Sequence, residues 1–263
     1  MLNLLGRAKI NLTLEIVGTS GGKHLLDSVF YPTVLADTAE AEKSDGVEIT
    51  YADGRRYERD TAYLTAKKIV ERYGVGGLKM RIEKGIPEGA GLGGSSVDAG
   101  LAARAMQALY NLPEIDPELL LSVGSDVPYF VQGGAKRVRG LGERIEEVVL
   151  PRLYGVILVP DSGVDTGACY RLYDEIGGEN GSTEEFLKQA KRDIRPFNAL
   201  QQAGERLNGK VSEGLRILKE AGFAACMTGS GSATFGVTTD EAAYRLRKKK
   251  AIESAYGFTI FEI

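Results

Sequence analysis

The sequence predicts a mixed helix-and-strand protein of the α+β class, divided into two domains. Residues 8–17 alternate apolar and polar side chains as a β-strand does, whereas residues 61–73 carry apolar side chains at helical spacing before Gly74, a common helix terminator. The character of the chain changes at residues 155–160, a continuous apolar run typical of a strand buried on both faces. We therefore place a domain boundary near Pro151. The two predicted domains are residues 1–150 and 151–263.

The same patterns assign the other elements of the N-terminal domain. Apolar residues recur at helical spacing after Ser95, which predicts a helix that ends near Asn111, before Pro113. Other runs alternate or are rich in strand-forming residues. The further predicted strands are residues 29–35, 47–51, 78–84 and 137–143.

The C-terminal domain also mixes helices with strands. Residues 224–235, AACMTGSGSATF, predict a strand, a Gly-rich turn and a second strand. A Gly-, Asn- and Ser-rich link at residues 177–182 separates two of the helices. The predicted helices are residues 170–176, 183–191, 198–207, 212–221 and 241–256, and the last predicted strand is residues 258–263.

Composition is that of an ordinary globular protein and excludes several other classes. The 263 residues are 43% hydrophobic and 26% charged, and the net charge of -3 gives no support to a nucleic-acid or anionic-membrane partner. No apolar run approaches the roughly 18 residues of a membrane span, and the N-terminus lacks a signal peptide's apolar region. Cys169 and Cys226 have no metal-ligand spacing. We expect a reduced, cytoplasmic protein that is a monomer or a homodimer.

The most informative stretch runs from Gly85 to Gly100, GIPEGAGLGGSSVDAG. It lies between a predicted strand and a predicted helix. Because glycine has no Cβ, backbone N–H groups in such a loop can approach a ligand closely. The first N–H groups of the following helix have no intrahelical partner, and the helix dipole is positive at that end. Together these features predict a phosphate site.

This loop differs from two common phosphate loops. It has no Gly-Lys-Ser/Thr ending, so it is not a Walker A motif. Gly89, Gly91 and Gly94 match G-x-G-x-x-G, but the acids that follow, Glu114 and Asp116, lie in a turn-like stretch after no apolar run. We therefore reject a dinucleotide site. A connection without a ligand remains the alternative, and the number of glycines argues against it.

Two serines begin the helix after the loop. Ser95 and Ser96 occupy the positions expected for an N-cap, and Asp98 follows in the first turn. Their hydroxyls either cap the helix or contact a phosphate or Mg²⁺, and one side chain can do both.

Other polar residues in the N-terminal domain are candidates for chemistry. Lys9 and Asn11 share one face of a half-buried strand, where a solvent-facing lysine is the alternative. His24, which is the only histidine, lies in a Gly-rich loop, where binding residues often gather. Asp126 stands in a turn before Pro128, as an N-cap or as a carboxylate aimed into a cleft.

A second small-residue loop, Gly229-Ser230-Gly231-Ser232, lies in the C-terminal domain. It either closes a plain hairpin or lets backbone approach a ligand.

Three of these stretches together resemble the three motifs of the GHMP kinase superfamily. AKINLTLEIVG is similar to the first motif, IPEGAGLGGSSVDAG to the second and MTGSGSATFG to the third. With GSDVPYF, LGERIEEV, LVPDSGVDTGACY and FNAL, the chain most resembles the branch that phosphorylates 4-diphosphocytidyl-2-C-methyl-D-erythritol on the methylerythritol phosphate route to isoprenoids. The resemblance spans nearly the whole chain.

The resemblance implies a fold, a reaction and cofactors. The fold is the two-domain GHMP kinase fold, with an N-terminal domain like domain 2 of ribosomal protein S5 and a C-terminal ferredoxin-like α/β sandwich. A cleft between the domains would hold ATP and a cytidine-diphosphate sugar alcohol. The reaction would move the ATP γ-phosphoryl group to the 2-hydroxyl of that alcohol, with Mg²⁺ bridging the phosphates.

The resemblance also implies roles for individual residues. Asp126 would accept the hydroxyl proton, and Lys9 would orient the hydroxyl and stabilise charge. Ser95 would also contact Mg²⁺ through ATP, and His24 would bind the cytosine. The implied ATP contacts are Pro87, Gly89, Ala90, Gly91, Leu92, Gly93, Gly94, Ser95 and Ser96, and the implied substrate contacts are Asn11, Lys23, His24, Gly229 and Ser230.

The sequence departs from that branch at three places. Its early loop usually reads Asp-Gly-Tyr-His, whereas here Lys23 stands where the tyrosine stacks on cytosine, so Tyr170 or Tyr173 becomes a candidate ring. The phosphate loop of that branch usually reads Gly-Gly-Gly-Ser-Ser-Asp, a run that this chain does not contain. The segment before Gly124 is also too short for the usual second helix. Two alternatives therefore stay open: a kinase for another small alcohol, such as mevalonate or homoserine, and a catalytically inactive nucleotide-binding relative.

Overall fold

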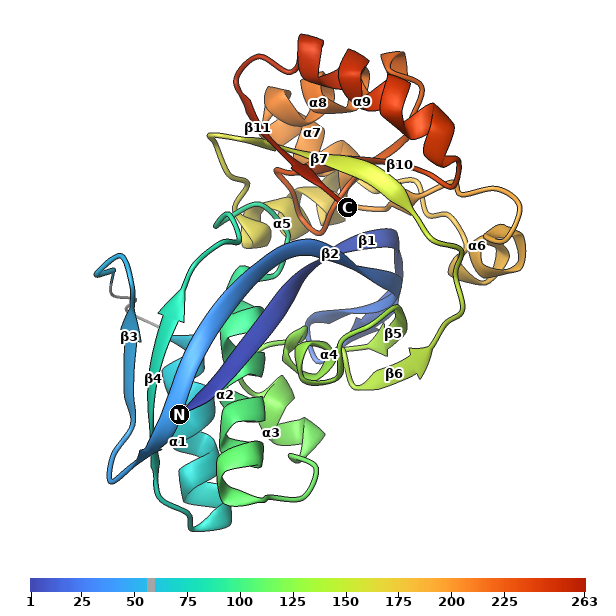
Figure 1. The fold of residues 1–263 in the computed structure, drawn as a ribbon. Coiled ribbons are helices and arrows are strands. Elements are labelled where there is room, and N and C mark those ends of the chain that lie inside the picture. Colours follow the sequence, from blue (N-terminus) through green and yellow to red (C-terminus); the bar gives the residue numbers. More distant parts are fainter. Residues whose placement is uncertain (56–59) are drawn as a thin grey trace.

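The computed structural model describes residues 1–55 and 60–263. It contains two β-sheets with helices packed against them (Figure 1). In the larger sheet the strand order is β3-β4-β2-β1-β8. Strand β5 pairs with β2 and also with β6. The smaller sheet has the order β11-β7-β10-β9. The larger sheet contains β1 (Leu2–Ser20), β2 (Lys23–Ser44), β3 (Glu48–Tyr51), β4 (Gly77–Glu83), β5 (Lys136–Gly140), β6 (Arg144–Glu147) and β8 (Phe197–Asn198), and the smaller contains β7 (Tyr154–Pro160), β9 (Ala224–Met227), β10 (Thr234–Thr238) and β11 (Phe258–Glu262).

A long antiparallel hairpin of β1 and β2 forms the central part of the larger sheet. The turn between its strands is Gly21-Gly22, and both glycines have positive φ, which side chains disfavour. His24 therefore lies in β2, paired with Thr19, so the prediction of a Gly-rich loop around it was wrong. Strand pairing continues almost to the turn and leaves only a tight tip.

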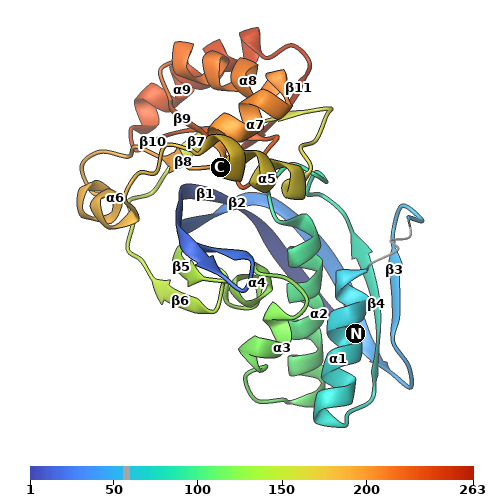
Figure 2. The ribbon, with the colours of Figure 1, turned by 180° about the vertical axis from the view of Figure 1, so that it is seen from behind.

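Four helices pack with the N-terminal half. They are α1 (Thr61–Tyr73), α2 (Gly94–Tyr110), α3 (Pro117–Leu121) and α4 (Val127–Gln132). Figure 2 shows α1 and α2 side by side against the larger sheet. Helix α1 ends at left-handed Gly74, and α2 is capped at left-handed Asn111, as predicted. The N-cap of α2 is Gly93, so the prediction of a serine cap was wrong.

The C-terminal half builds the smaller sheet and its helices. Helices α7 (Gln201–Leu207), α8 (Gly209–Glu220) and α9 (Glu241–Ser254) lie on its outer side, while α5 (Thr166–Ile176) lies near the β1–β2 hairpin (Figures 1 and 2). Helix α6 (Thr183–Gln189) contacts β1 and β2. Strand β7 is buried almost throughout, as its apolar run predicted.

One short strand crosses from the C-terminal half into the larger sheet. Phe197 and Asn198 pair in parallel with Thr13 and Leu14 of β1. The predicted helix over residues 198–207 was therefore wrong at its start, because the chain first adds this strand and only then begins α7. The pairing anchors the C-terminal half beside the middle of β1.

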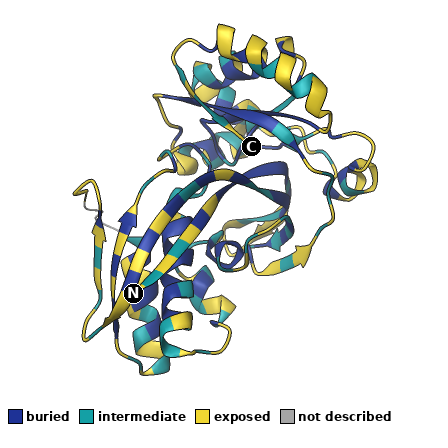
Figure 3. Cartoon of the chain, viewed as in Figure 1, coloured by how far each residue is buried: buried dark blue, intermediate teal, exposed yellow. Residues whose placement is uncertain are grey.

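Burial on β1 shows how the two halves meet. Lys9, Asn11 and Thr13 are each at most 3% exposed, so the prediction of a half-buried strand was wrong. The apolar face packs into the core, and C-terminal segments contact the polar face, where the backbone N–H of Asn11 donates to Thr228 Oγ1 at 3.1 Å. Figure 3 shows β1 and β2 dark blue where they pass beneath the smaller sheet. The polar face of β1, which the sequence pattern predicts to be exposed to solvent, is therefore an internal polar surface.

No helix within residues 1–55 and 60–263 is long and apolar enough to cross a membrane. Cys169 and Cys226 are both buried and free of disulfides.

Substituting one buried glycine will test the packing that positions α4. A Cβ at Gly100 of α2 would lie 2.8 Å from Phe130 Cβ and 3.0 Å from its carbonyl oxygen. We expect Gly100→Ala to lower the free energy of unfolding by about 1–3 kcal/mol, because two packed helices must separate. Urea denaturation measures this change.

Gly209→Ala is the matched control, because a Cβ on Gly209, also in a helix, meets nothing within 4 Å. We expect this variant to be neutral or stabilised by up to about 1 kcal/mol. Equal destabilisation by both substitutions would contradict the packing argument.

Candidate functional site

One large cavity, of about 680 Å³, is lined by every residue that the family resemblance implied for ATP, substrate or catalysis. Its wall combines the middle of β1, the tip of the β1–β2 hairpin, the Gly-rich loop, the start of α2, the start of α5 and the loop between β9 and β10. Segments far apart in the chain therefore meet here. The structure brings the predicted residues together, while their individual roles stay predictions.

The Gly-rich loop connects β4 to α2 and is shaped by left-handed glycines. Gly89, Gly91 and Gly93 have φ of +65°, +75° and +86°. A Cβ on Gly91 would collide with the carbonyl oxygen of Thr228, whereas one on Gly89 would meet nothing within 4 Å. Glycine at position 91 is therefore required by close packing between two protein loops, and Gly89 faces open space.

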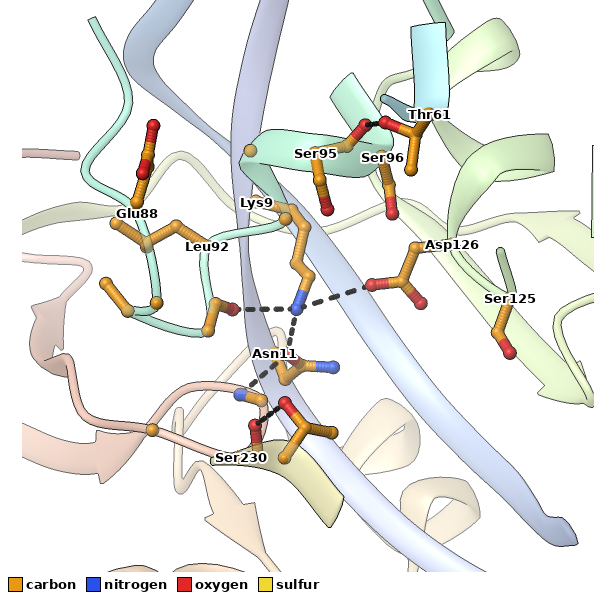
Figure 4. Close-up of a pocket in the computed structure, with 18 of the residues that line it drawn as sticks. Lys9, Asn11, Thr61, Glu88, Leu92, Ser95, Ser96, Ser125, Asp126 and Ser230 are labelled. Carbon is orange, nitrogen blue, oxygen red and sulfur yellow. Dashed lines mark hydrogen bonds and ion pairs between the residues drawn. The ribbon is translucent and has the colours of Figure 1, made fainter. Parts of the chain in front are cut away.

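The start of α2 lines the cavity, and its first backbone N–H groups have no acceptor within the helix. Its N-cap, Gly93, supplies no side-chain hydrogen bond. Ser95 and Ser96 lie in the first turn and line the cavity, and Thr61 Oγ1 donates to the carbonyl oxygen of Ser95 at 2.6 Å (Figure 4). A helix N-terminus without a capping side chain attracts anions through its N–H groups and its dipole.

The Lys9 ammonium lies at the centre of the cavity wall. Its Nζ donates to Asn11 Oδ1 at 2.6 Å and to the carbonyl oxygen of Gly91 at 3.0 Å, and it is 3.8 Å from Asp126 Oδ2 (Figure 4). Burial lowers the pKa of Lys9, and the nearby Asp126 carboxylate only partly opposes this shift. The sequence alternative of a solvent-facing lysine is therefore excluded.

Asp126 stands at the N-cap position of α4, but its side chain makes no capping hydrogen bond. The carboxylate points towards Lys9 (Figure 4), and its side chain is 30% exposed. Of the two sequence interpretations, the structure supports a carboxylate that faces a cleft. Such a group can accept a proton from a bound hydroxyl.

Asn11 joins the two halves of the protein at the site. Its Oδ1 accepts hydrogen bonds from Lys9 Nζ and from the backbone N–H of Gly229, the latter at 2.9 Å. Its Nδ2 donates to Ser28 Oγ at 2.9 Å. The side chain of Asn11 therefore fixes the β9–β10 loop against the lysine.

His24 also lines the cavity and is held by two partners that the sequence analysis did not assign to it. Its Nε2 lies 2.7 Å from Asp174 Oδ1, and its ring stacks on Tyr170 with centroids 4.8 Å apart. Tyr173 contacts the same ring edge-on at 6.0 Å, but only Tyr170 lines the cavity. Of the two candidate stacking rings, Tyr170 is thus the one that a ligand can reach.

A buried ion cluster lies beneath the Gly-rich loop and was missed by the sequence analysis. Lys84 Nζ donates to Asp37 Oδ2 and to Asp98 Oδ2, both at 2.6 Å. Asp37 Oδ1 accepts from the backbone N–H groups of Gly85 and Ile86 at 2.8 and 2.9 Å. The cluster therefore fixes the first residues of the loop. The only hint was the prediction that Asp98 lies in the first turn of the helix; in the structure it is the fifth residue of α2, beyond that turn.

The described part of the chain contains no group of three or more His, Cys, Asp or Glu side chains arranged to hold a metal ion. A divalent cation would need oxygens from a ligand to complete its coordination.

Alanine substitutions at two glycines of the Gly-rich loop separate the effect of a steric clash from the effect of backbone strain. Gly91→Ala should lower the melting temperature by several degrees, because its Cβ collides with the Thr228 carbonyl group. Gly89→Ala has the same positive-φ strain but no clash, so we expect it to lose less stability. Thermal unfolding followed by circular dichroism compares them. Melting temperatures that fall equally would show that backbone strain alone explains both glycines.

Comparisons with known proteins agree with this site. The GHMP kinases N terminal domain matches residues 60–134, and the GHMP kinases C terminal domain matches residues 179–250. A 4-diphosphocytidyl-2-C-methyl-D-erythritol kinase of Moorella thermoacetica is 34% identical over 99% of this chain and 98% of that protein. The kinase of the same name from Thermus thermophilus is 36% identical, over 89% and 86%.

Solved structures confirm the fold class. A crystal structure of 4-(cytidine 5'-diphospho)-2C-methyl-D-erythritol kinase has a TM-score of 0.81 at 32% identity, over 99% of this chain and 98% of that one. The homoserine kinase of Cytophaga hutchinsonii, at 16% identity and a TM-score of 0.69 over 99% and 93%, shows the shared fold alone. As the three sequence motifs predicted, the chain belongs to the GHMP kinase family of ATP-dependent kinases.

Proposed function

We propose that this kinase transfers the γ-phosphoryl group of ATP to the 2-hydroxyl of 4-diphosphocytidyl-2-C-methyl-D-erythritol. The observation that carries the proposal is the Lys9–Asp126 pair, which faces a cavity shared with the uncapped start of α2. Full-length similarity to kinases named for that substrate supports the choice of alcohol.

In this mechanism Asp126 accepts the proton of the attacking hydroxyl. Lys9, held by Asn11 and the Gly91 carbonyl group, orients the hydroxyl and offsets charge on the transferred group. Phosphoryl transfer depends mainly on positioning and on neutralising charge, so a fixed ammonium beside a partly exposed carboxylate suits it.

ATP would bind with its phosphates at residues 87–96, where the Gly-rich loop and the start of α2 supply backbone N–H groups. Among the described residues that line the cavity, besides His24, the charged side chains are three lysines and four acids, a balance of 3 − 4 = −1 when all are ionised. The site alone therefore has no excess positive charge for a triphosphate. We infer that Mg²⁺ would enter with ATP, that Ser95 would help to hold it, and that it would offset the charge of the phosphates.

The alcohol substrate would occupy the side of the cavity formed by Asn11, Lys23, His24, Gly229 and Ser230. The Tyr170 ring, in stacked contact with His24, offers the cytosine an aromatic surface in place of the tyrosine that Lys23 replaces. Asp174 orients the imidazole.

We also propose residues 1–150 and 151–263 as the two domains, with the cavity between them. The enzyme would act in the cytoplasm as a monomer or a homodimer, without a nucleic-acid or membrane partner.

The proposed base is tested by Asp126→Asn, which keeps the shape but removes the proton acceptor. We expect kcat to fall roughly a hundredfold or more and the Kd of ATP to stay nearly unchanged. ADP release from Mg·ATP with the cytidyl substrate measures the first quantity, and calorimetry measures the second. Asp45→Asn, at an exposed position between β2 and β3, is the control and should retain activity.

Two results would overturn parts of the proposal. Unchanged kcat in Asp126→Asn would remove this residue from the base role. No turnover of the cytidyl substrate by the wild-type enzyme, with turnover of mevalonate or homoserine, would instead replace the proposed alcohol.

The pH dependence of kcat should report the buried ammonium. Since burial lowers the pKa of Lys9, its charge is lost at a lower pH than that of an exposed lysine, and kcat should fall on the alkaline side. Lys9→Arg keeps a permanent charge, so its residual activity should lack that alkaline decline. A pH–kcat profile of both proteins decides the point, and an identical alkaline decline would assign it to another group.

A further inference from the structure

The Asp37–Lys84–Asp98 cluster has an unbalanced charge in a buried place. Asp37, Lys84 and Asp98 have side chains that are 0%, 7% and 4% exposed. One ammonium is shared by two carboxylates, so the cluster has a net charge of −1 when all three are ionised. An uncompensated buried charge is costly, and a group in such a place often takes or loses a proton instead.

The two carboxylates differ in how completely they are satisfied. Asp37 uses both oxygens, one for Lys84 and one for two backbone N–H groups. Asp98 uses Oδ2 for Lys84, but within residues 1–55 and 60–263 its buried Oδ1 has no hydrogen-bond partner. A proton added to the cluster therefore belongs on Asp98 Oδ1, because no donor there stabilises negative charge on that buried oxygen.

The cluster is also part of the proposed nucleotide site. Lys84 and Asp98 both line the cavity, and Lys84 Nζ lies 3.5 Å from the carbonyl oxygen of Gly94, the first residue of α2. Negative charge brought to the start of α2 will repel the negative charge of the cluster, because Coulomb interactions are strong where water is excluded.

We propose that binding of nucleotide phosphates at the start of α2 is coupled to the uptake of one proton by Asp98. This inference rests on the proposed position of ATP in the Gly-rich loop. The proton comes from solvent and forms an O–H bond on Oδ1, and no other bond changes. The cluster becomes neutral when the anion arrives, and Lys84 keeps both of its hydrogen bonds. Asp98 thereby acts as a positioning residue whose charge follows occupancy of the site.

The direction of the effect agrees with the surroundings of Asp98. Burial raises the pKa of Asp98 to about 7, although the Lys84 ammonium opposes the shift, and Asp37 adds to it. Near neutral pH the free enzyme would therefore hold Asp98 partly ionised, so a small added repulsion can change its protonation. The other charged groups that line the cavity are Lys9, Lys23, His24, Asp60, Glu88 and Asp126.

Proton uptake is measured by calorimetry of a non-hydrolysable Mg·ATP analogue in buffers with different ionisation enthalpies. At pH 7.5, a carboxyl group with a pKa of about 7 can take up at most about three-quarters of a proton. We expect uptake approaching that value in the wild type. In Asp98→Asn we expect no proton uptake by residue 98. Asp45→Asn makes the same chemical change at an exposed position, so its proton uptake should match that of the wild type.

Affinity as a function of pH gives a second readout that a purely structural role would not produce. Above pH 7 the wild-type Kd should rise by up to about tenfold per pH unit, because the proton becomes harder to supply. Asp98→Asn resembles the protonated state, so its Kd should stay flat and become the lower of the two at alkaline pH. His24→Asn should keep the wild-type proton uptake, and it controls for the imidazole that lines the same cavity.

Several outcomes would overturn the inference. Equal proton uptake by the wild type and Asp98→Asn, or uptake lost only in His24→Asn, would assign the proton to another group. Zero uptake by the wild type with normal nucleotide affinity would refute the coupling even if the variant failed to fold. No binding of the nucleotide analogue to the wild-type enzyme would refute the proposed ATP site itself, and the inference with it.

Discussion

The contact between the Gly-rich loop and the β9–β10 loop is the constraint on which the rest of the site depends. Gly91 approaches the backbone of Thr228 so closely that no side chain fits, and the N–H of Ala233 donates to the carbonyl oxygen of Ala90 at 3.2 Å. These contacts join segments more than 130 residues apart in sequence. Because the Gly91 carbonyl group also accepts from Lys9, the same contact fixes the position of the ammonium. Packing between the two halves thus sets the geometry of the chemistry.

Burial gives Lys9 properties that an exposed lysine lacks. An ammonium surrounded by water is screened and free to move, whereas this one is 3% exposed and has two fixed acceptors, on Asn11 and Gly91. Its carboxylate partner, Asp126, is 3.8 Å away and more open to solvent. The pair is therefore a weak ion pair whose carboxylate stays accessible to a ligand, as a proton acceptor must be. A shorter, closed salt bridge at this place would compete with the substrate hydroxyl.

Sequence patterns predicted most elements because these depend on local signals, and with the family resemblance they named residues that line one cavity, whose roles stay predictions. Glycine spacing located the loop, and alternation located Lys9 and Asn11 on one face. The patterns failed where distant segments decide the outcome. Nothing near Asn198 indicates a strand until β1 is available to pair with it. Likewise, Asp37, Lys84 and Asp98 are ordinary charged residues in sequence, and their cluster exists only because β2, the end of β4 and α2 converge.

Two groups of charged side chains at the site differ in their charge balance: Lys9 with Asp126, and Lys84 with Asp37 and Asp98. In the first group one ammonium lies 3.8 Å from one carboxylate, so the proposed base has an opposite charge beside it. A second lone carboxylate in the same cavity would oppose the incoming phosphates, so its charge must be offset elsewhere. Lys84 offsets one of the two acids beneath the loop, and the proposed proton would neutralise the other. In the proposed mechanism Mg²⁺ would offset charge on the phosphates, whereas a proton, which needs no coordination shell, would balance a place too enclosed for a hydrated ion.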